Sequence, residues 1–236
     1  LSVPQADGST TESNHGVAVK GLDRSGNVEA HSGWAPLPDM AEQRSRPTTV
    51  ALADGRAMVI GGWDNNRAHA LDSVEVLAAD GSGWSALAPM GTARNKPAAA
   101  VLPCGKVLVA GGEDSDVSAL MTAELWDPAT GAWSDLPPMA EAKYRAGCCV
   151  LPSGRVAAVG GKGSDRQSRR DGEAFDPVAQ TWQPLPPMAH ARSHHGVVAV
   201  AGGLLAVGGC QTDDEDDEGD RQVMLAEAGG GRGASD

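Results

Sequence analysis

The sequence has few aromatic residues and no long apolar run. Only six Trp, one Tyr and one Phe occur among its 236 residues. No stretch approaches the roughly 18 apolar residues of a membrane-crossing helix, which excludes a transmembrane helix, and we expect no membrane insertion. The first ten residues, LSVPQADGST, have neither a basic start nor an apolar core, so they predict no signal peptide, and they lack an initiator Met.

Basic residues are also scarce. The formal net charge of −12 argues against nucleic acid as a partner, because phosphate backbones require a basic surface. The cysteines show no CxxC pair and no metal-finger spacing. We therefore expect reduced, packing cysteines and a cytoplasmic location, with adjacent strand residues Cys148 and Cys149 facing opposite sides. The four cysteines are Cys104, Cys148, Cys149 and Cys210.

Glycine, proline and one repeated phrase are abundant instead. The 31 Gly and 15 Pro indicate many turns and few long helices. The phrase reads GWAPLPDM, GWSALAPM, AWSDLPPM and TWQPLPPM, and its tryptophans are separated by 50, 49 and 49 residues. A Met follows each Trp by six residues, a base follows each Met by four, and a glycine doublet comes next. The four series are Trp34, Trp84, Trp133 and Trp182; Met40, Met90, Met139 and Met188; Arg44, Arg94, Lys143 and Arg192; and Gly61-Gly62, Gly111-Gly112, Gly160-Gly161 and Gly208-Gly209.

Each repeat predicts four antiparallel strands. The stretch before a doublet, for example TTVALADGRAMVIGG, is an apolar run, a turn with Gly and a second apolar run. Such a pattern is typical of a hairpin, and the continuous apolar runs indicate strands covered on both faces. A more polar third strand follows, and the Trp phrase opens the fourth.

This repeat resembles the kelch family, whose period is near 50 residues. The resemblance rests on the doublet, the Trp–Met spacing, the base, and an aromatic seven residues before the Trp, present as Trp126 and Phe175 but replaced at Leu77 and Asn27. It covers residues 28–209 and implies an all-β fold: a kelch-type β-propeller with four sequence-defined blades of four antiparallel strands. We expect each Trp to pack between blades, and the Arg/Lys series to bond carbonyls or acids there.

Two arrangements of the blades stay open. The Trp34 phrase has no doublet before it, and the last repeat has a third strand near residues 222–228 but no Trp phrase after it. Residues from Trp34 would complete that last blade and close the ring, with HGVAVKGL as an extra strand; alternatively the chain is a truncated part of a larger ring. The predicted organisation is an N-terminal extension (1–27), a propeller (28–228) and a Gly-rich tail (229–236).

The polar loops after the doublets are the candidate binding elements, because loops on a rigid scaffold carry most binding functions. Together they are expected to line one rim of the propeller. For any single loop, a solvated turn is the competing interpretation. The candidate binding residues are Asp64, Asn65, Asn66, Arg67, Glu113, Asp114, Asp116, Asp165, Arg166, Asp213, Asp214 and Asp216.

No pattern in the sequence predicts catalysis, a metal or a cofactor. The acidic run at 213–220 imitates the start of an EF-hand, but Leu225 stands where a bidentate Glu is required. His194 and His195, placed on a strand, would face opposite ways. The copper oxidases of the kelch family need a pair of tyrosines, and the chain has only Tyr144. We therefore expect a non-enzymatic scaffold for protein–protein interaction; a carbohydrate-active or sugar-isomerising enzyme with a small-molecule sugar as ligand is the alternative.

Overall fold

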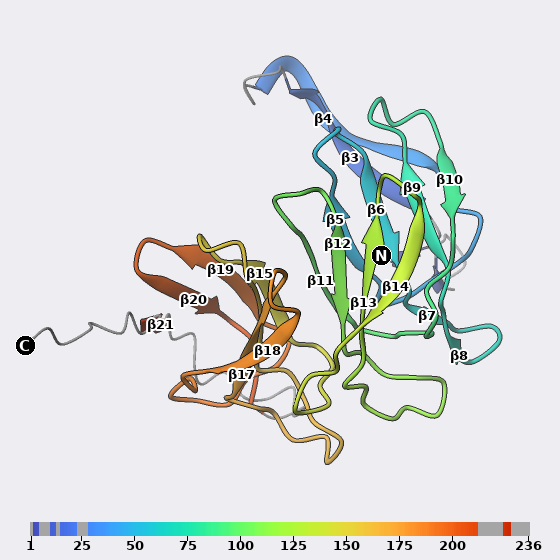
Figure 1. The fold of residues 1–236 in the computed structure, drawn as a ribbon. Coiled ribbons are helices and arrows are strands. Elements are labelled where there is room, and N and C mark those ends of the chain that lie inside the picture. The colour runs from blue at the N-terminus through green and yellow to red at the C-terminus, as the bar shows by residue number, and fades with distance from the viewer. Residues whose placement is uncertain (1, 5–9, 13–14, 23–27, 212–223, 228–236) are drawn as a thin grey trace, which may run out of the picture.

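All regular elements among the described residues are β-strands, arranged as successive sheets that fan out from a common centre (Figure 1). The computed structural model describes residues 2–4, 10–12, 15–22, 28–211 and 224–227, with side chains from residue 36 to residue 211. None of the described residues belongs to a helix with the length and hydropathy of a membrane span.

Three full repeats form three four-stranded antiparallel sheets, here called blades 1, 2 and 3. Within each blade the strands lie in chain order, so every strand pairs with its sequence neighbour in the blade. Blade 1 contains β5 (Thr48–Ala51), β6 (Ala57–Ile60), β9 (Val74–Leu77) and β10 (Trp84–Leu87). Blade 2 contains β11 (Ala98–Val101), β12 (Val107–Ala110), β13 (Ala123–Asp127) and β14 (Ala132–Leu136). Blade 3 contains β15 (Gly147–Val150), β16 (Val156–Val159), β17 (Gly172–Asp176) and β18 (Thr181–Leu185).

The last repeat forms a three-stranded sheet, blade 4, and the other strands form small sheets. Blade 4 contains β19 (Gly196–Val200), β20 (Gly203–Val207) and β21 (Met224–Glu227). The two-stranded sheets are β3 (His15–Leu22) with β4 (Val28–Asp39), β1 (Ser2–Pro4) with β2 (Thr10–Glu12), and β7 (Trp63–Asp64) with β8 (His69–Ala70). The strand predicted for HGVAVKGL is thus β3. It pairs with β4, although the two strands lie on opposite sides of the boundary predicted at residue 27 between the N-terminal extension and the propeller. The limits at residues 27 and 228 themselves lie outside the described residues.

The hydrophobic core lies between adjacent blades. One cluster joins blades 1 and 2 and includes Trp126, a second joins blades 2 and 3 around Phe175, and a third joins blades 3 and 4. The second strands β12 and β16, VLVA and VAAV, are buried along their whole length. This confirms the prediction of strands covered on both faces, because blades 2 and 3 are each packed between two others.

Trp133 and Trp182 connect neighbouring blades, as predicted, and Trp84 connects blade 1 to β4. Each indole Nε1–H group donates to the backbone carbonyl of the residue that stands four positions after the Trp of the preceding repeat. The bonds are Trp84 to Pro38, Trp133 to Ala88 and Trp182 to Pro137, at 2.9, 2.9 and 2.8 Å. The side chain of Trp34 lies outside the described side chains.

The described blades form an open arc. The first strands β5, β11, β15 and β19 lie beside one another in that order, which places them at the centre of the fan. The prediction that residues from Trp34 complete the last blade is wrong for the described sheets, because β4 pairs with β3 and blade 4 ends at β21.

The cysteines of β15 behave as predicted. Cys148 packs against the cluster between blades 2 and 3, whereas Cys149 packs against the cluster between blades 3 and 4. Burial raises the pKa of both thiols, that of Cys149 to about 11. Neither thiol is therefore ionised at neutral pH, and both act as small packing residues. All four cysteines are free.

Candidate functional site

Each blade is preceded by a linker, and in blades 1 to 3 a buried ion pair fixes the position of that linker. We call residues 40–47, 90–97, 139–146 and 188–195 the blade linkers. In the second linker Arg94 is fully buried and donates to the Gly111 and Thr122 carbonyls at 2.8 and 2.9 Å and to Glu124 at 2.9 Å. Arg44 repeats this pattern in blade 1. The basic residues bond carbonyls and acids as predicted, but these partners belong to the blade that the linker precedes, so the prediction that the bonds run between blades is wrong.

The acids of these ion pairs were not identified from the sequence. Glu75, Glu124 and Glu173 are buried and 49 residues apart, and each accepts bonds from two backbone N–H groups of its linker. The matching period of 49 residues was the signal available in the sequence. Each carboxylate therefore joins a linker to the third strand of the same blade.

Blade 3 replaces arginine by lysine and compensates with a second acid. Arg94 donates to the hydroxyl of Thr122, whereas the corresponding position in blade 3 is Asp171. Lys143 is paired with Asp171 at 2.8 Å and with Glu173 at 3.4 Å. An ammonium group is a compact charge without the planar fork of a guanidinium, so a carboxylate replaces the hydroxyl as its second partner.

The glycine doublets allow the blades to approach one another. A Cβ on Gly111 would lie 2.1 Å from the Lys143 carbonyl oxygen in the next linker, and a Cβ on Gly112 would lie 2.9 Å from that of Asn95 in its own linker. The Gly112 N–H donates to the Lys143 carbonyl at 2.9 Å. The doublet thus holds two linkers against the end of one strand.

The loops that follow the doublets leave every blade at the same edge as the linkers. Isolated bridges join linker to loop in each repeat. We call this edge the loop face; in Figure 1 it points downward. The prediction of a common rim is thereby met by the loops of blades 1 to 3. The bridges are Ser45 with Trp63, Asn95 with Glu113, Tyr144 with Lys162, and Ser193 with Cys210.

The structure separates the candidate binding residues into internal and exposed groups. Asp64 is buried and caps its own loop, accepting from the Asn66 and Arg67 N–H groups at 2.8 and 3.2 Å. Glu113 is buried against Lys96 at 2.5 Å. Asp114 is half-buried and caps its loop in the same way. The exposed candidates are Asn65, Asn66, Arg67, Asp116, Asp165 and Arg166. Asp213, Asp214 and Asp216 lie outside the described residues.

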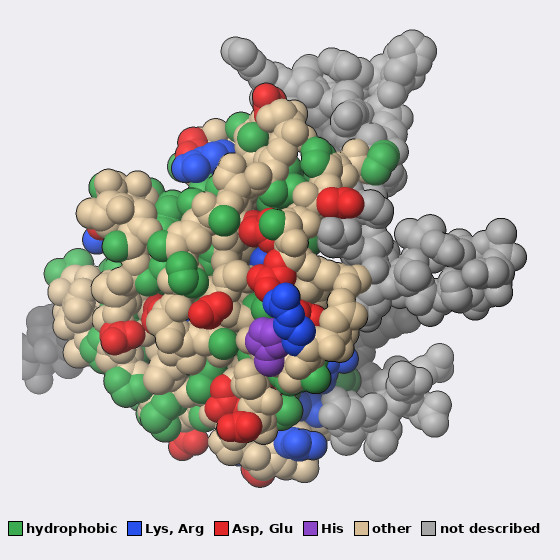
Figure 2. Space-filling view, turned by 90° about the vertical axis from the view of Figure 1, so that its right-hand side faces the viewer, with side chains coloured by type: hydrophobic (Ala, Val, Ile, Leu, Met, Phe, Trp, Pro, Cys, Tyr) green, Lys and Arg blue, Asp and Glu red, His purple; other side chains and the backbone are tan. Residues whose placement is uncertain are grey.

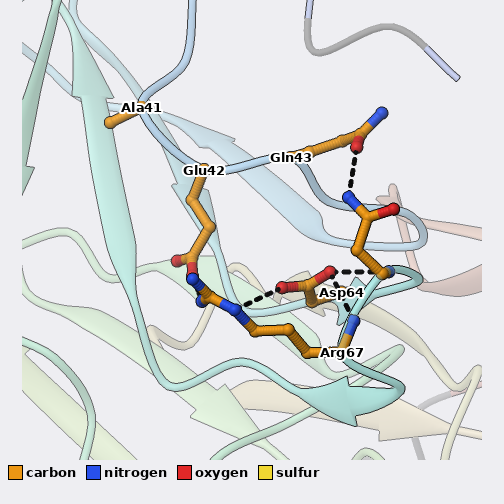
Figure 3. Close-up of a pocket in the computed structure, with 6 residues that line it drawn as sticks. Ala41, Glu42, Gln43, Asp64 and Arg67 are labelled. Atoms are coloured by element: carbon orange, nitrogen blue, oxygen red, sulfur yellow. Dashed lines mark hydrogen bonds and ion pairs between the residues drawn. The ribbon is translucent and has the colours of Figure 1, made fainter.

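Some of these residues form a groove on the loop face of blade 1 (Figure 3). Its volume is about 530 Å³, and its lining includes Glu42, Gln43, Asp64, Asn66 and Arg67. The Arg67 guanidinium extends between the two carboxylates, 3.7 Å from each, and 70% of its side chain is exposed. The Asn66 amide donates to Gln43 at 3.0 Å, which joins the loop to the linker.

A second cavity, which we call the axial pocket, lies where the four linkers meet. Its volume is about 310 Å³. Each linker contributes the residue two positions beyond its base, namely Arg46, Lys96, Arg145 and His194. Backbone hydrogen bonds join these four residues, because the N–H groups of Lys96, Arg145 and His194 donate to the carbonyls of Arg46, Lys96 and Arg145 at 3.2, 3.1 and 3.3 Å. All four have positive φ, between 54° and 59°. The lining is Arg46, Pro47, Lys96, Pro97, Arg145, Ala146, His194 and His195.

The two histidines of the last linker diverge, although not on a strand as predicted. They precede β19, where His194 is exposed and His195 is buried. Burial, and then the charge of Arg192, lower the pKa of His195 to about 4, against an opposing effect of the Val159 backbone. His195 is therefore neutral at pH 7. Within the described residues, no group of three or more His, Cys, Asp or Glu side chains is placed to hold a metal ion.

Acidic side chains are spread over one face of the molecule. Figure 2 shows the side that faces right in Figure 1, where the fewer basic side chains are interspersed among the acidic ones. Residues 36–211 hold 18 acids and 15 bases, so most of the net charge of −12 lies outside the described side chains.

The comparisons with known proteins concern the fold. Family models of the kelch motif match residues 94–140 and 144–189, which correspond to blades 2 and 3. No curated protein sequence matches the chain significantly. A solved structure titled "Structure of YjhT" is similar, with a TM-score of 0.68 over 83% of this chain at 15% identity. The chain spans 66% of the length of that solved chain, and identity at this level is evidence for the fold alone.

Four repeats in phase, antiparallel blades packed around a centre, and two matches to the kelch motif lead to one conclusion. The chain is a kelch-repeat protein with a β-propeller fold.

Proposed function

We propose that this kelch-repeat propeller is a scaffold that binds a protein partner on its loop face. The observation that carries the proposal is the groove of blade 1, whose base is rigid and whose rim is exposed and polar. Glu42 in its lining accepts a bond from Ser73, and both lie within reach of the buried Arg44–Glu75 pair. A preorganised surface of this kind loses little conformational entropy on binding.

The exposed residues of the groove are suited to protein recognition. Arginine is enriched among the residues that dominate protein–protein binding energies. Arg67 has two carboxylates at 3.7 Å and remains largely exposed, so its charge is available for a further partner. The loops of blades 2 and 3 present Asp116 and Asp165 on the same face. A partner with polar groups of both signs would complement this surface.

Affinity capture with matched arginine variants tests the proposal. The bait is the full chain, and captured proteins are identified and then titrated individually. Arg67→Ala is expected to reduce binding at least ten-fold, as removal of a central interface arginine commonly does. The matched control is Arg56→Ala, because Arg56 lies in the β5–β6 turn at the opposite edge and also pairs with an aspartate. Equal binding by both variants and the unaltered chain would contradict the proposal. A rise in the melting temperature with millimolar sugar would instead favour the carbohydrate-active or sugar-isomerising enzyme.

A further inference from the structure

The fourth linker brings a serine and a histidine against a cysteine, and the proposed scaffold role uses none of the three. Cys210 is the first residue after the last glycine doublet, and its backbone exchanges two hydrogen bonds with Ser193, each 3.0 Å long. The Sγ atom of Cys210 lies 3.7 Å from Nδ1 of His194 and 3.9 Å from Oγ of Ser193. The Ser193 hydroxyl lies 3.1 Å from the same nitrogen, so the three side chains form one cluster.

Blade 2 shows how the fold uses the same two positions elsewhere. There Glu113 is the first residue after the doublet, and its backbone exchanges the same two hydrogen bonds with Asn95. The Glu113 carboxylate is paired with the ammonium group of Lys96, which occupies the position of His194 in its repeat. The fold therefore holds the side chain that follows the doublet against the residue two positions beyond the linker base. In blade 4 the acid at this place is a thiol and the base is an imidazole.

The other three thiols lack this arrangement. Cys148 and Cys149 pack in the clusters between blades, and burial raises the pKa of both. Cys104 is exposed in the β11–β12 turn, and no hydrogen bond joins it to a histidine of the described residues. Cys210 is half-buried, so its side chain keeps some contact with solvent. Reactive cysteines are partly exposed and lie beside a group such as histidine, and the described residues give these surroundings to Cys210.

We propose that Cys210 is a redox modification site, at which hydrogen peroxide oxidises the thiol to a sulfenic acid with His194 as the base. His194 takes the thiol proton, and the thiolate attacks one oxygen of the peroxide. The S–O bond forms as the O–O bond breaks, so the sulfur loses two electrons and the peroxide gains them. The leaving hydroxide takes the proton from His194 and departs as water. The Ser193 hydroxyl is placed to donate to the thiolate before the attack.

The groups around this pair set the conditions of the test. His194 lines the axial pocket, and the described lining of that pocket contains no carboxylate. The blade 3 loop contributes the uncharged Ser168, whose hydroxyl donates to the Cys210 carbonyl at 3.3 Å. The acidic run at 213–220 follows Cys210 in the sequence and lies outside the described residues. Rates are therefore measured in high salt, which screens charges of both signs. The other lining residues that carry or accept a proton are Arg46, Lys96, Arg145 and His195.

Alkylation of the full chain by iodoacetamide, followed at each cysteine by peptide mass spectrometry, tests the pair of thiol and imidazole. The exposed Cys104 is the reference within the same molecule. At pH 7 we expect Cys210 to react about ten-fold faster than Cys104, because an unassisted thiol is only a few per cent ionised at this pH. Between pH 8 and pH 6 the rate at Cys104 should fall almost ten-fold for each unit of pH, and the rate at Cys210 should fall much less. Equal rates and equal pH dependence at the two cysteines would overturn the proposal.

A histidine variant identifies the base. His194→Asn is expected to slow the alkylation of Cys210 about ten-fold at pH 7 and to give it the pH dependence of Cys104. Asn is chosen because it tolerates the positive φ of 59° at this position. The matched control is His190→Asn, which removes a histidine of the same linker and should leave the rate at Cys210 unchanged. An equal rate at Cys210 in His194→Asn and in the unaltered chain would overturn the role of His194 as the base.

Oxidation is tested with dilute hydrogen peroxide and a dimedone probe, which labels sulfenic acids. The label is expected on Cys210 before Cys104, and about ten-fold less of it is expected on Cys210 in His194→Asn. Cys148 and Cys149 show in every sample whether the chain is folded, because they stay unlabelled only while the blades are packed. Absence of the label from Cys210, or equal labelling of Cys104 and Cys210, would overturn the proposal.

This modification site does not rest on the proposed scaffold role, because it shares no residue with the groove of blade 1. Loss of partner binding in Arg67→Ala with unchanged reactivity of Cys210 would support the scaffold role alone. The two proposals can therefore fail separately.

Discussion

Replacement of Arg94 by methionine would test whether the buried ion pair holds its linker against blade 2. Arg94 is fully buried, and its partner Glu124 retains 2% of its side-chain exposure. Methionine keeps much of the apolar stem but removes the donors to Glu124 and to the Gly111 and Thr122 carbonyls. The carboxylate would then keep only its bonds from the Gly91 and Thr92 N–H groups.

The expected destabilisation follows from this uncompensated charge. Breaking a buried ion pair by removing one partner costs about 3–5 kcal/mol, a large fraction of the roughly 5–15 kcal/mol that stabilises a typical domain. A second substitution determines whether charge is the cause. Glu124→Gln should destabilise the unaltered chain, because it weakens the bond to Arg94, yet it should stabilise Arg94→Met, because it removes the unpaired charge.

The assay is urea unfolding followed by tryptophan fluorescence, with all four members of the double-mutant cycle measured together. Arg56→Met serves as control, since Arg56 forms a 2.7 Å pair with Asp54 but is 37% exposed, and such pairs contribute about 1 kcal/mol or less. A loss below about 1 kcal/mol in Arg94→Met, or a harmful effect of Glu124→Gln in both backgrounds, would refute the reasoning.

Three further predictions concern single positions. Gly111→Ala should lower the free energy of unfolding by about 3 kcal/mol or more, because its Cβ would lie 2.1 Å from a backbone oxygen of the next linker. The control is Gly131→Ala, which has a similar φ and no described neighbouring atom within 4 Å of the Cβ position, and which should cost about 1–2 kcal/mol. Equal melting temperatures of the two variants would contradict this. Trp133→Phe should cost about 1 kcal/mol in denaturant unfolding through loss of its indole hydrogen bond to the Ala88 carbonyl, and an unchanged unfolding midpoint would contradict this. The pKa of His195 is lowered from 6.5 to about 4, so the unfolded chain binds this proton before the folded chain does as the pH falls. The free energy of unfolding should therefore decline by up to about 3 kcal/mol between pH 6.5 and pH 4. His195→Leu should reduce this dependence of stability on pH, and an unchanged dependence would refute the role of His195.

The sequence predicted the features that recur in every blade more accurately than the pairing of strands from distant parts of the chain. Blade composition, the position of the Trp between blades and the internal role of the basic series followed from the phase of the repeat, because each residue has the same surroundings in every blade. The interpretation of Trp34 as the closing strand was wrong, because the same phrase fits a strand paired with β3 as well as one paired with β21. The pairing of two distant strands depends on the residue pattern of both strands, so the Trp34 phrase alone does not specify its partner.

Among the candidate site residues, sequence position alone did not distinguish caps from exposed groups. Asp64 and Asn65 are adjacent polar residues of one loop, but only Asp64 turns inward to accept backbone N–H groups. Aspartate at the start of a tight loop commonly does so, which was the available signal. The partners Glu75 and Glu124 were overlooked because each is a single acid within an apolar strand, and only the three-dimensional pairing shows the carboxylate opposite the linker.

The two basic series share a period but differ in what explains it. Arg94 and its equivalents are buried among carbonyls and carboxylates, so packing accounts for their charge. Arg46 lies two residues beyond Arg44 and is exposed, so packing requires no charge at that position. A propeller brings its linkers to one centre, and any residue type repeated there is concentrated several-fold. Three linkers therefore bring a cation to the axial pocket, a concentration of charge that no single blade has.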